Sequence, residues 1–131
     1  MSRNAINAPG AAAVGPYSHA VEANGLVFLS GQTPLDPTTG KLVTGSIGEQ
    51  TAQCFRNLFR VLEAAELTPG DVVNVQVYLT DMNNFAAMNE VYATQFAKPY
   101  PARTTIGVAS LPMGAQVEIG MTARTRGGYA V

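Results

Sequence analysis

Hydrophobic and polar positions alternate along two segments of this chain in the manner of β-strands. In residues 73–80 every second position is aliphatic and the positions between carry polar or aromatic side chains, which predicts a strand with one buried face. A similar alternation predicts a final strand over residues 115–125, and we interpret residues 103–109 as a further strand.

A β-hairpin is predicted nearer the beginning of the chain. Residues 17–22 and 26–30 flank the sequence Ala23-Asn24-Gly25, and an Asn-Gly pair tolerates the positive φ that tight turns require. The prolines and glycine of residues 32–44 predict an irregular excursion after this hairpin. Residues 8–15 are small and show no hydrophobic period, so we interpret them as an arm.

Two segments show the spacing of three and four residues that is typical of helices. Ser46 and Glu49 form a capping-box pattern, an apolar stripe runs from Cys54 to Ala65, and Pro69-Gly70 predicts the end of this helix. A second helix is predicted over residues 83–96, with Pro99 just beyond it. Its apolar stripe consists of Phe85, Met88, Tyr92 and Phe96.

The predicted order is strand, strand, helix, strand, helix, strand, strand, with a turn at residues 111–114 before the last strand. This order indicates an α+β fold in which both helices cover one face of the sheet and the other face needs a partner. With 131 residues, the chain has the length of one domain, and we interpret residues 1–131 as that domain.

The chain contains few charged residues. They make up 13% of the sequence, against about 25% in a typical soluble domain, while 47% of the residues are hydrophobic. A secreted or low-charge monomer would have this composition. We favour burial of part of the surface against other subunits, because charged residues are depleted from the centres of protein interfaces.

The charges that are present do not indicate binding to nucleic acid or membranes. There are 8 basic and 9 acidic residues, the net charge is -1, and the basic residues are scattered, so no strong field attracts phosphate groups or anionic lipid. The N-terminus lacks the apolar core of a signal peptide, and no segment approaches the roughly 20 apolar residues that span a bilayer. We therefore expect a cytoplasmic protein.

The sequence lacks the residues for internal disulfide formation, metal binding and nucleophilic catalysis by a triad. The single Cys54 has no second cysteine with which to form an internal disulfide, and with the single His19 it makes no cluster at metal-ligand spacing. Cys54 lies on the apolar stripe of the first helix, where a free cysteine behaves as a small hydrophobe. The sequence shows no serine or cysteine triad and no glycine-rich phosphate loop. We expect neither metal nor cofactor.

Two charged residues lie on predicted strands. Arg103 begins a strand among apolar neighbours, where a guanidinium needs a planar partner such as a carboxylate; that partner is a ligand, or Glu118, or Arg103 lies on the surface. Glu118 shares a strand face with Gly120 and Thr122. Burial there would raise its pKa toward the range useful for proton transfer, and the alternative is an exposed glutamate.

Three other polar residues are weaker candidates. Asn89 falls on the stripe of the second helix, where it either orients a ligand or binds a loop. Tyr17 and Ser30 have hydroxyl groups near strand ends, where most such groups are structural.

A set of short motifs occurs along the chain in a recognisable order. They are Gly15-Pro16-Tyr17-Ser18, Ser30-Gly31-Gln32, Glu49-Gln50-Thr51, Asp81-Met82 with Phe85, Met88-Asn89 and Tyr92, Pro101-Ala102-Arg103-Thr104, Leu111-Pro112 and Val117-Glu118-Ile119. From about Gly15 to Ala123 the chain resembles the Rid family of reactive-intermediate deaminases, also called YjgF or L-PSP, and within it the RidA-like subgroup.

The resemblance implies a chorismate-mutase-like (bacillus type) α+β fold, assembled as a homotrimer with clefts at the subunit interfaces. It also implies hydrolysis of 2-imino acids, the unstable products of pyridoxal-phosphate enzymes, to 2-keto acids and ammonia without a cofactor. The matching positions assign Arg103 to the substrate carboxylate and Glu118 to the attacking water. The other positions that it assigns to the cleft are Tyr17, Ser30, Gly31, Asn89 and Thr105.

Two positions depart from the family pattern. Thr105 stands where many RidA members have a cysteine, so oxidation through that cysteine is not expected here. Gly120 replaces the second acid of the usual Glu-Ile-Glu segment, which leaves the substrate preference open.

Two other functions remain to be weighed. Some family members have been named as endoribonucleases that cleave single-stranded RNA and inhibit translation, and the near-neutral charge of this chain disfavours that activity. The other alternative is a non-catalytic trimer that binds small carboxylates.

Overall fold

A computed structural model describes residues 3–9 and 15–126 of the chain. Most of the predicted arm over residues 8–15 lies outside the described residues, and so does the Gly127-Gly128 tail, for which the sequence predicts fraying. Within residues 3–9 and 15–126, no helix combines the length and the apolar character that a membrane span requires.

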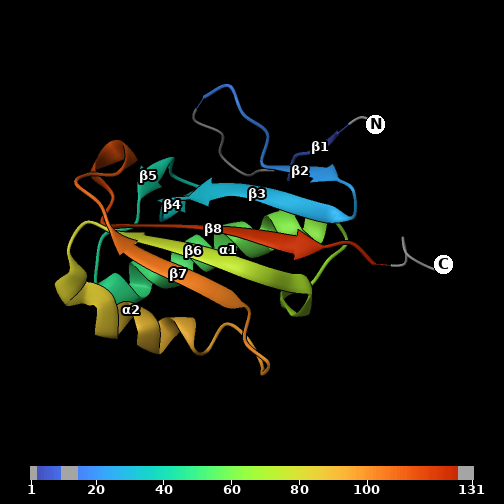
Figure 1. The fold of residues 1–131 in the computed structure, drawn as a ribbon. Helices are drawn as coiled ribbons and strands as arrows, with labels where there is room; N and C mark the ends of the chain where they lie inside the picture. Colours follow the sequence, from blue (N-terminus) through green and yellow to red (C-terminus); the bar gives the residue numbers. More distant parts are fainter. Residues whose placement is uncertain (1–2, 10–14, 127–131) are drawn as a thin grey trace.

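Six strands form one mixed sheet in the order β1-β2-β3-β8-β6-β7 (Figure 1). They are β1 (Asn4–Ile6), β2 (Ala20–Ala23), β3 (Leu26–Gln32), β6 (Val72–Leu79), β7 (Ala102–Gly107) and β8 (Val117–Arg124). The β6–β7 pair is parallel and the other neighbours are antiparallel. Strand β7 pairs with β6 alone, so it is an edge strand of this sheet.

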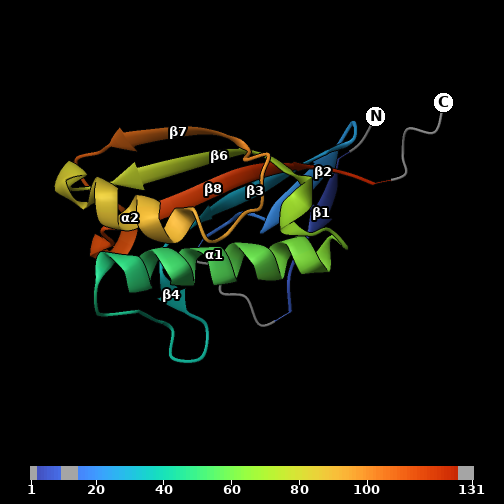
Figure 2. The ribbon, with the colours of Figure 1, turned by 90° about the horizontal axis from the view of Figure 1, so that it is seen from below.

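Helices α1 (Ile47–Ala64) and α2 (Phe85–Tyr92) cover one face of this sheet, and the other face is bare (Figure 2). The predicted capping box is present, since Ser46 Oγ accepts the Glu49 N–H at 3.1 Å and Glu49 Oε1 accepts the Ser46 N–H at 3.2 Å. The α+β class and the predicted order of the main elements are confirmed.

The core lies between the helices and the sheet. The α1 stripe is fully buried, and its Phe55 ring lies edge-on to Tyr92 and Phe96 at centroid distances of 5.7 and 5.6 Å. Truncating a buried phenylalanine such as Phe55 to alanine costs about 3–5 kcal/mol of folding free energy, which indicates how strongly this cluster joins α1 to α2.

The bare face of the sheet exposes large apolar side chains. Phe28 on β3 and Ile106 on β7 are 47% and 45% exposed, and Leu26 is also exposed. A sheet face of this kind typically packs against another surface.

Three details of the strands differ from the sequence-based expectation. Strand β1 was not predicted, because residues 4–6 are too few to show a period. The expected excursion contains a small two-stranded sheet of β4 (Leu35–Asp36) and β5 (Lys41–Leu42). Val73 was expected on the buried face and is 41% exposed, because a register shift between Val72 and Asn74 turns it outward.

The second helix is shorter than expected. A short 3₁₀ helix (Met82–Asn84) precedes it, and α2 ends at Tyr92, although the prediction extended to Phe96. Phe96 is nevertheless buried against Phe55, so the apolar spacing correctly marked a core residue that lies beyond the helix.

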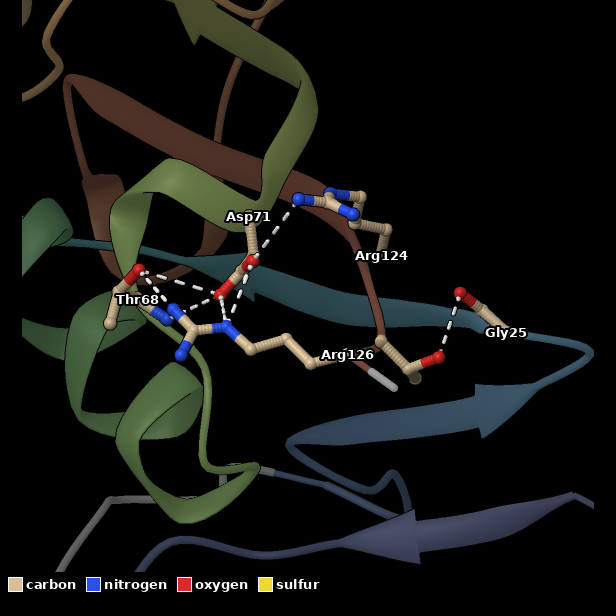
Figure 3. A network of polar contacts seen from close by, with 6 residues as sticks. Gly25, Thr68, Asp71, Arg124 and Arg126 are labelled. Carbon is tan, nitrogen blue, oxygen red and sulfur yellow. Dashed lines mark hydrogen bonds and ion pairs between the residues drawn. The ribbon is translucent and has the colours of Figure 1, made fainter. Parts of the chain in front are cut away.

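The far end of β8 is joined to the α1–β6 connection by a polar network (Figure 3). The buried Asp71 carboxylate accepts hydrogen bonds from Arg126 Nε at 2.9 Å and from the Thr68 N–H at 2.9 Å, and Arg124 lies at 4.0 Å. The Arg126 and Thr68 hydrogen bonds outweigh the desolvation of Asp71, so the pKa of this carboxyl lies below its ordinary value.

Candidate functional site

A pocket of about 320 Å³ brings together four of the residues singled out in the sequence, namely Tyr17, Ser30, Gly31 and Glu118. Glu118 is the second residue of β8, and its side chain points to the bare face of the sheet because it pairs with Tyr78 rather than with a core residue. Ser30 and Gly31 lie where the β3–β8 register shifts between Leu29 and Gln32. This irregularity opens the sheet beside Glu118.

Gly31 lies directly against the Glu118 side chain. A Cβ atom added to Gly31 would collide with Glu118 Oε2 and would lie only 3.1 Å from the carboxyl carbon. Glycine therefore leaves the space that the carboxylate occupies at this point.

The Glu118 carboxyl is half-buried, and desolvation raises its pKa above the ordinary glutamate value. The pKa of Glu118 is therefore shifted upward, as the sequence predicts for a buried carboxyl group. Burial raises the pKa of the Cys54 thiol much further, with a smaller contribution from the Glu118 charge. Cys54 has no exposed surface, which agrees with its interpretation as a core residue.

Ser30 serves the backbone beside this pocket. Its hydroxyl donates to the Ser18 carbonyl at 2.6 Å and its N–H donates to the His19 carbonyl at 2.9 Å. The buried His19 ring in turn accepts the Ala8 N–H on Nδ1 at 2.9 Å. These contacts fix the segment that carries Tyr17, whose side chain is 45% exposed at the pocket.

Arg103 lines a second pocket, of about 280 Å³, together with Asn89 and Tyr92. Its Nη1 donates to Asn89 Oδ1 at 2.6 Å, and its guanidinium lies 4.5 Å from the centre of the Tyr92 ring and 5.6 Å from that of Phe85. Helix α2 therefore orients the guanidinium with one amide and two aromatic rings.

No carboxylate among the described residues forms an ion pair with Arg103. The alternative expectation of a salt bridge to Glu118 is wrong, and Asn89 accepts the Arg103 hydrogen bond. A half-buried guanidinium that keeps its charge is suited to bind an anionic ligand.

Thr105 lies two residues after Arg103 on the same face of β7, beside the buried Val77. Its hydroxyl oxygen is buried and lacks a hydrogen-bond partner among the described residues, and the same is true of the Tyr92 hydroxyl. Orphaned buried hydroxyl groups near a charged side chain are found where a ligand or ordered water completes a site.

Arg103 and Glu118 do not meet within one protomer. Arg103 pairs across the sheet with Val75, which is fully buried toward the helices, whereas Glu118 pairs with Tyr78, three residues farther along β6. Side chains three positions apart on a strand point to opposite faces. The chain therefore presents two separate pockets, the Arg103 pocket on the helix side of the sheet and the Glu118 pocket on the bare side.

Several pocket residues were not singled out in the sequence. Phe85 and Tyr92 were quoted in the family motifs and placed on the apolar stripe of the second helix but were not assigned to the cleft, and their contact with Arg103 required the position of β7 relative to that helix. Met113 lies at the Glu118 pocket with a φ of 62°, in a segment predicted only as a turn. The motifs also contain Gln32, Pro112 and Pro101 without assigning them to the cleft, and the pocket residues that were not singled out at all are Thr33, Leu35, Ala93 and Tyr100.

The described residues offer no group of three or more histidine, cysteine, aspartate or glutamate side chains that could hold a metal ion. The polar groups that line the two pockets are instead a guanidinium, a carboxylate, two amides and hydroxyls. Such a set can bind a small anion and transfer a proton.

Residues 5–125 match the family model described as endoribonuclease L-PSP. A RutC family protein of Pyrococcus horikoshii is 48% identical over 106 residues, which cover 81% of this chain and 84% of that protein. The 2-iminobutanoate/2-iminopropanoate deaminase of Mus musculus is 45% identical over 108 residues, covering 82% of this chain and 80% of that protein. The crystal structure of E. coli TdcF with bound serine has a TM-score of 0.86 at 35% identity, covering 93% of this chain and 98% of TdcF.

Proposed function

The chain belongs to the Rid family, and from this membership and its two pockets we propose that it hydrolyses 2-imino acids to 2-keto acids and ammonia. The L-PSP family model corresponds to this family. The observation that carries the proposal is the Arg103 guanidinium, which is oriented by Asn89 and Tyr92 but has no carboxylate partner among the described residues. The carboxylate of a small substrate is the partner that its planar fork fits.

The proposal includes a homotrimer with its clefts between subunits. The bare sheet face with Phe28 and Ile106, together with the low content of charged residues, supports association through that face. In such an assembly the Arg103 pocket of one protomer meets the Glu118 pocket of the next. The placement of these two residues on opposite faces of one protomer supports this arrangement, because a single small substrate needs both groups on one side.

The reaction adds water across a C=N bond. The imine carbon is already electrophilic, so the site mainly needs to fix the carboxylate on Arg103 and to place a water molecule beside that carbon. Glu118 accepts a proton from the water molecule as the water oxygen forms the C–O bond, and the imine nitrogen takes a proton from solvent, which gives a carbinolamine. Glu118 then returns its proton to the nitrogen as the C–N bond breaks, the hydroxyl group loses its proton to solvent, and ammonia leaves the 2-keto acid.

The raised pKa of Glu118 suits this proton transfer, because a base near the operating pH also returns its proton readily. No covalent nucleophile takes part in these steps. Tyr17, Ser30, Gly31 and Thr105 complete the cleft in this proposal: Gly31 leaves room for the Glu118 carboxylate, and the buried Thr105 hydroxyl is available to bind a ligand or water next to Arg103.

Names of relatives agree with a small-molecule substrate. The mouse relative is named 2-iminobutanoate/2-iminopropanoate deaminase, and the E. coli relative was crystallised with serine, a small amino acid that carries a carboxylate.

A coupled assay tests the proposed activity. An amino-acid oxidase generates imines of several chain lengths, and the rate of 2-keto acid formation with the protein is compared with the rate in buffer alone. We expect acceleration by the wild type and none by Arg103→Ala, with both proteins eluting as the same oligomer. Equal rates for wild type and buffer on every imine, with a 2-keto acid still bound, would instead favour the non-catalytic carboxylate-binding protein.

The name of the family model provides one observation in favour of a second activity, cleavage of single-stranded RNA. The net charge of -1 and the scattered basic residues disfavour it. RNA cleavage that survives repurification and is lost in Arg103→Ala would establish that activity.

A further inference from the structure

The wall of the Glu118 pocket is attached to helix α1 by two buried amide side chains. Asn57 Nδ2 donates to the Leu35 carbonyl at 2.8 Å and to the Thr33 carbonyl at 3.3 Å. Gln53 Nε2 donates to Asn57 Oδ1 at 2.9 Å and to the Leu35 carbonyl at 3.4 Å. Thr33 and Leu35 belong to the segment that follows β3, and both line the pocket.

These amides are buried on the same helix as the apolar stripe. Gln53 and Asn57 are one turn apart on α1 and are only 9% and 7% exposed. A buried amide is costly unless its donors and acceptor are paired. Here they are paired. Gln53 Oε1 accepts from Arg56 Nη2 at 2.8 Å, Asn57 Oδ1 accepts from Gln53 Nε2, and Asn57 Nδ2 donates to the Leu35 carbonyl.

The wall of the pocket is the segment from Ser30 to Leu35, and it lies beside the Glu118 carboxylate. The segment from Ser30 to Leu35 supplies five of the nine residues that line the pocket, and Gly31 within it lies against Glu118. A tight turn follows, in which the Leu35 N–H donates to the Thr33 carbonyl at 2.7 Å. The carbonyl of Thr33 thus accepts from both the turn and Asn57, so a movement of Asn57 displaces the turn and the chain that leads to Gly31.

We propose that Gln53 and Asn57 are positioning residues for the proposed imine-hydrolysing site: through the Thr33 and Leu35 carbonyls they set the distance between the pocket wall and the Glu118 carboxylate. Neither side chain lines the pocket, so they act on the substrate only through the wall. The inference rests on the proposed function for its catalytic consequence, but the link between the amides and Glu118 is independent of any substrate.

The same helix contains a matched control. Gln50 is 7% exposed and donates to the Gly45 carbonyl at 3.1 Å and to Gln116 Oε1 at 2.9 Å. Neither Gly45 nor Gln116 lines the Glu118 pocket. Gln50→Leu therefore removes a buried amide of the same kind from the same helix without detaching the wall.

The main test compares Asn57→Leu with Gln50→Leu in the full-length protein, and Gln53→Glu serves as a second wall variant if Asn57→Leu does not fold. Gln53→Glu keeps the acceptor for Arg56, removes the donors to Asn57 and Leu35, and places a carboxylate oxygen, whose charge Arg56 offsets, next to those two acceptors. Each variant is measured for its melting temperature, its kcat and KM on imines, and the titration of Glu118 by carboxyl ¹³C NMR.

We expect Asn57→Leu to lower kcat/KM about tenfold and Gln53→Glu to lower it by a smaller factor, with the Glu118 pKa falling toward its ordinary value as water enters beside the carboxylate. Gln50→Leu should lower the melting temperature comparably and leave kcat/KM and the Glu118 titration unchanged. Parallel losses of kcat/KM in Asn57→Leu and Gln50→Leu would overturn the inference. A Glu118 titration that stays as in the wild type in both wall variants would also overturn it.

The titration also separates this inference from the proposed function. If the wild type hydrolyses no imine but Asn57→Leu still shifts the Glu118 titration and Gln50→Leu does not, the proposed activity fails and the link from α1 to Glu118 stands. If the wild type is active and the wall variants keep its kcat, KM and titration, the activity stands and the positioning role fails.

Discussion

Arg103 on β7 and Glu118 on β8 point to opposite faces of the same sheet, although only β6 separates their strands. The pairing partners on β6 decide this, since Val75 faces the helices and Tyr78 faces the bare side. Within one chain the two side chains therefore lie on different sides of the sheet, and the proposed trimer brings them together between neighbouring subunits.

Mixing two variants of low activity, each impaired at one of the two residues, tests the proposed shared site. In a cyclic trimer of Arg103→Ala and Glu118→Gln subunits exchanged at equal ratio, about a quarter of the interfaces combine an intact Arg103 with an intact Glu118. We expect activity to return to about that fraction of the wild-type rate. Each variant alone, carried through the same exchange, is the control, and an inactive mixture of verified mixed trimers would contradict the arrangement.

Asn89 orients Arg103 through the 2.6 Å hydrogen bond, so its replacement should weaken substrate binding. We expect Asn89→Ala to raise KM about tenfold, which corresponds to about 1.4 kcal/mol. Asn89→Asp should raise KM further, because a carboxylate at this position pairs with Arg103 and competes with the substrate. Steady-state kinetics check the order, and a lower KM for the aspartate variant than for the alanine variant would contradict it.

Gly31→Ala should displace the Glu118 carboxylate, because the new Cβ would occupy its place. We expect a loss of kcat of about tenfold or more with a small change in melting temperature, since only the end of one side chain has to move. Gly70→Ala is the matched control: its added Cβ would meet nothing closer than 3.6 Å, so activity should persist. Wild-type kcat in Gly31→Ala would show that the carboxylate position is unimportant.

The pH dependence of the reaction should report the raised pKa of Glu118. A carboxyl with a raised pKa stays protonated to a higher pH, so a base at this position loses activity as the pH falls through that raised value. The acid limb of kcat/KM should therefore lie above the ordinary glutamate pKa of 4.5. Glu118→Gln should lack this limb in its residual activity, and an unchanged limb would assign it to another group.

Asp71 should contribute to stability in a pH-dependent way. Its folded-state pKa is lowered, so its stabilisation is present above the ordinary value of 3.8 and is lost as the pH falls through the lower folded value. We expect Asp71→Asn to lower the free energy of unfolding by about 2 kcal/mol at neutral pH. Urea unfolding should show this difference shrinking below about pH 4. Asp36→Asn is the control, because the Asp36 side chain accepts the exposed N–H of Thr38 in a turn.

The long periodic segments made the main elements predictable. The α1 stripe and capping box, and the alternation in β6 and β8, each specify a local structure without reference to the rest of the chain. The turned-out Val73 and the end of α2 at Tyr92 depend on packing that a period does not encode. Strand β1 forms only because β2 offers it an edge.

The site was predictable in its charged residues and not in its geometry. Arg103 and Glu118 were identified because charge on a strand is unusual, Asn89 because it falls on the apolar stripe of the second helix, and Gly31 because of a family resemblance. The face to which each charge points depends on strand register, which connects residues far apart in sequence. The hydrogen bonds of Asn57 reach carbonyls 22 and 24 positions away, so nothing in its local sequence distinguishes it from a surface amide.

Strand β8 has Glu118 near its first residue and leads to Arg126 and the Asp71 network at its other end (Figures 1 and 3). Six residue steps of extended chain lead from Glu118 to Arg124, a distance of about 20 Å. Substitutions in the Asp71 network would therefore change the stability of the protein at the end of the strand remote from the carboxylate, which separates effects on folding from effects on the pocket.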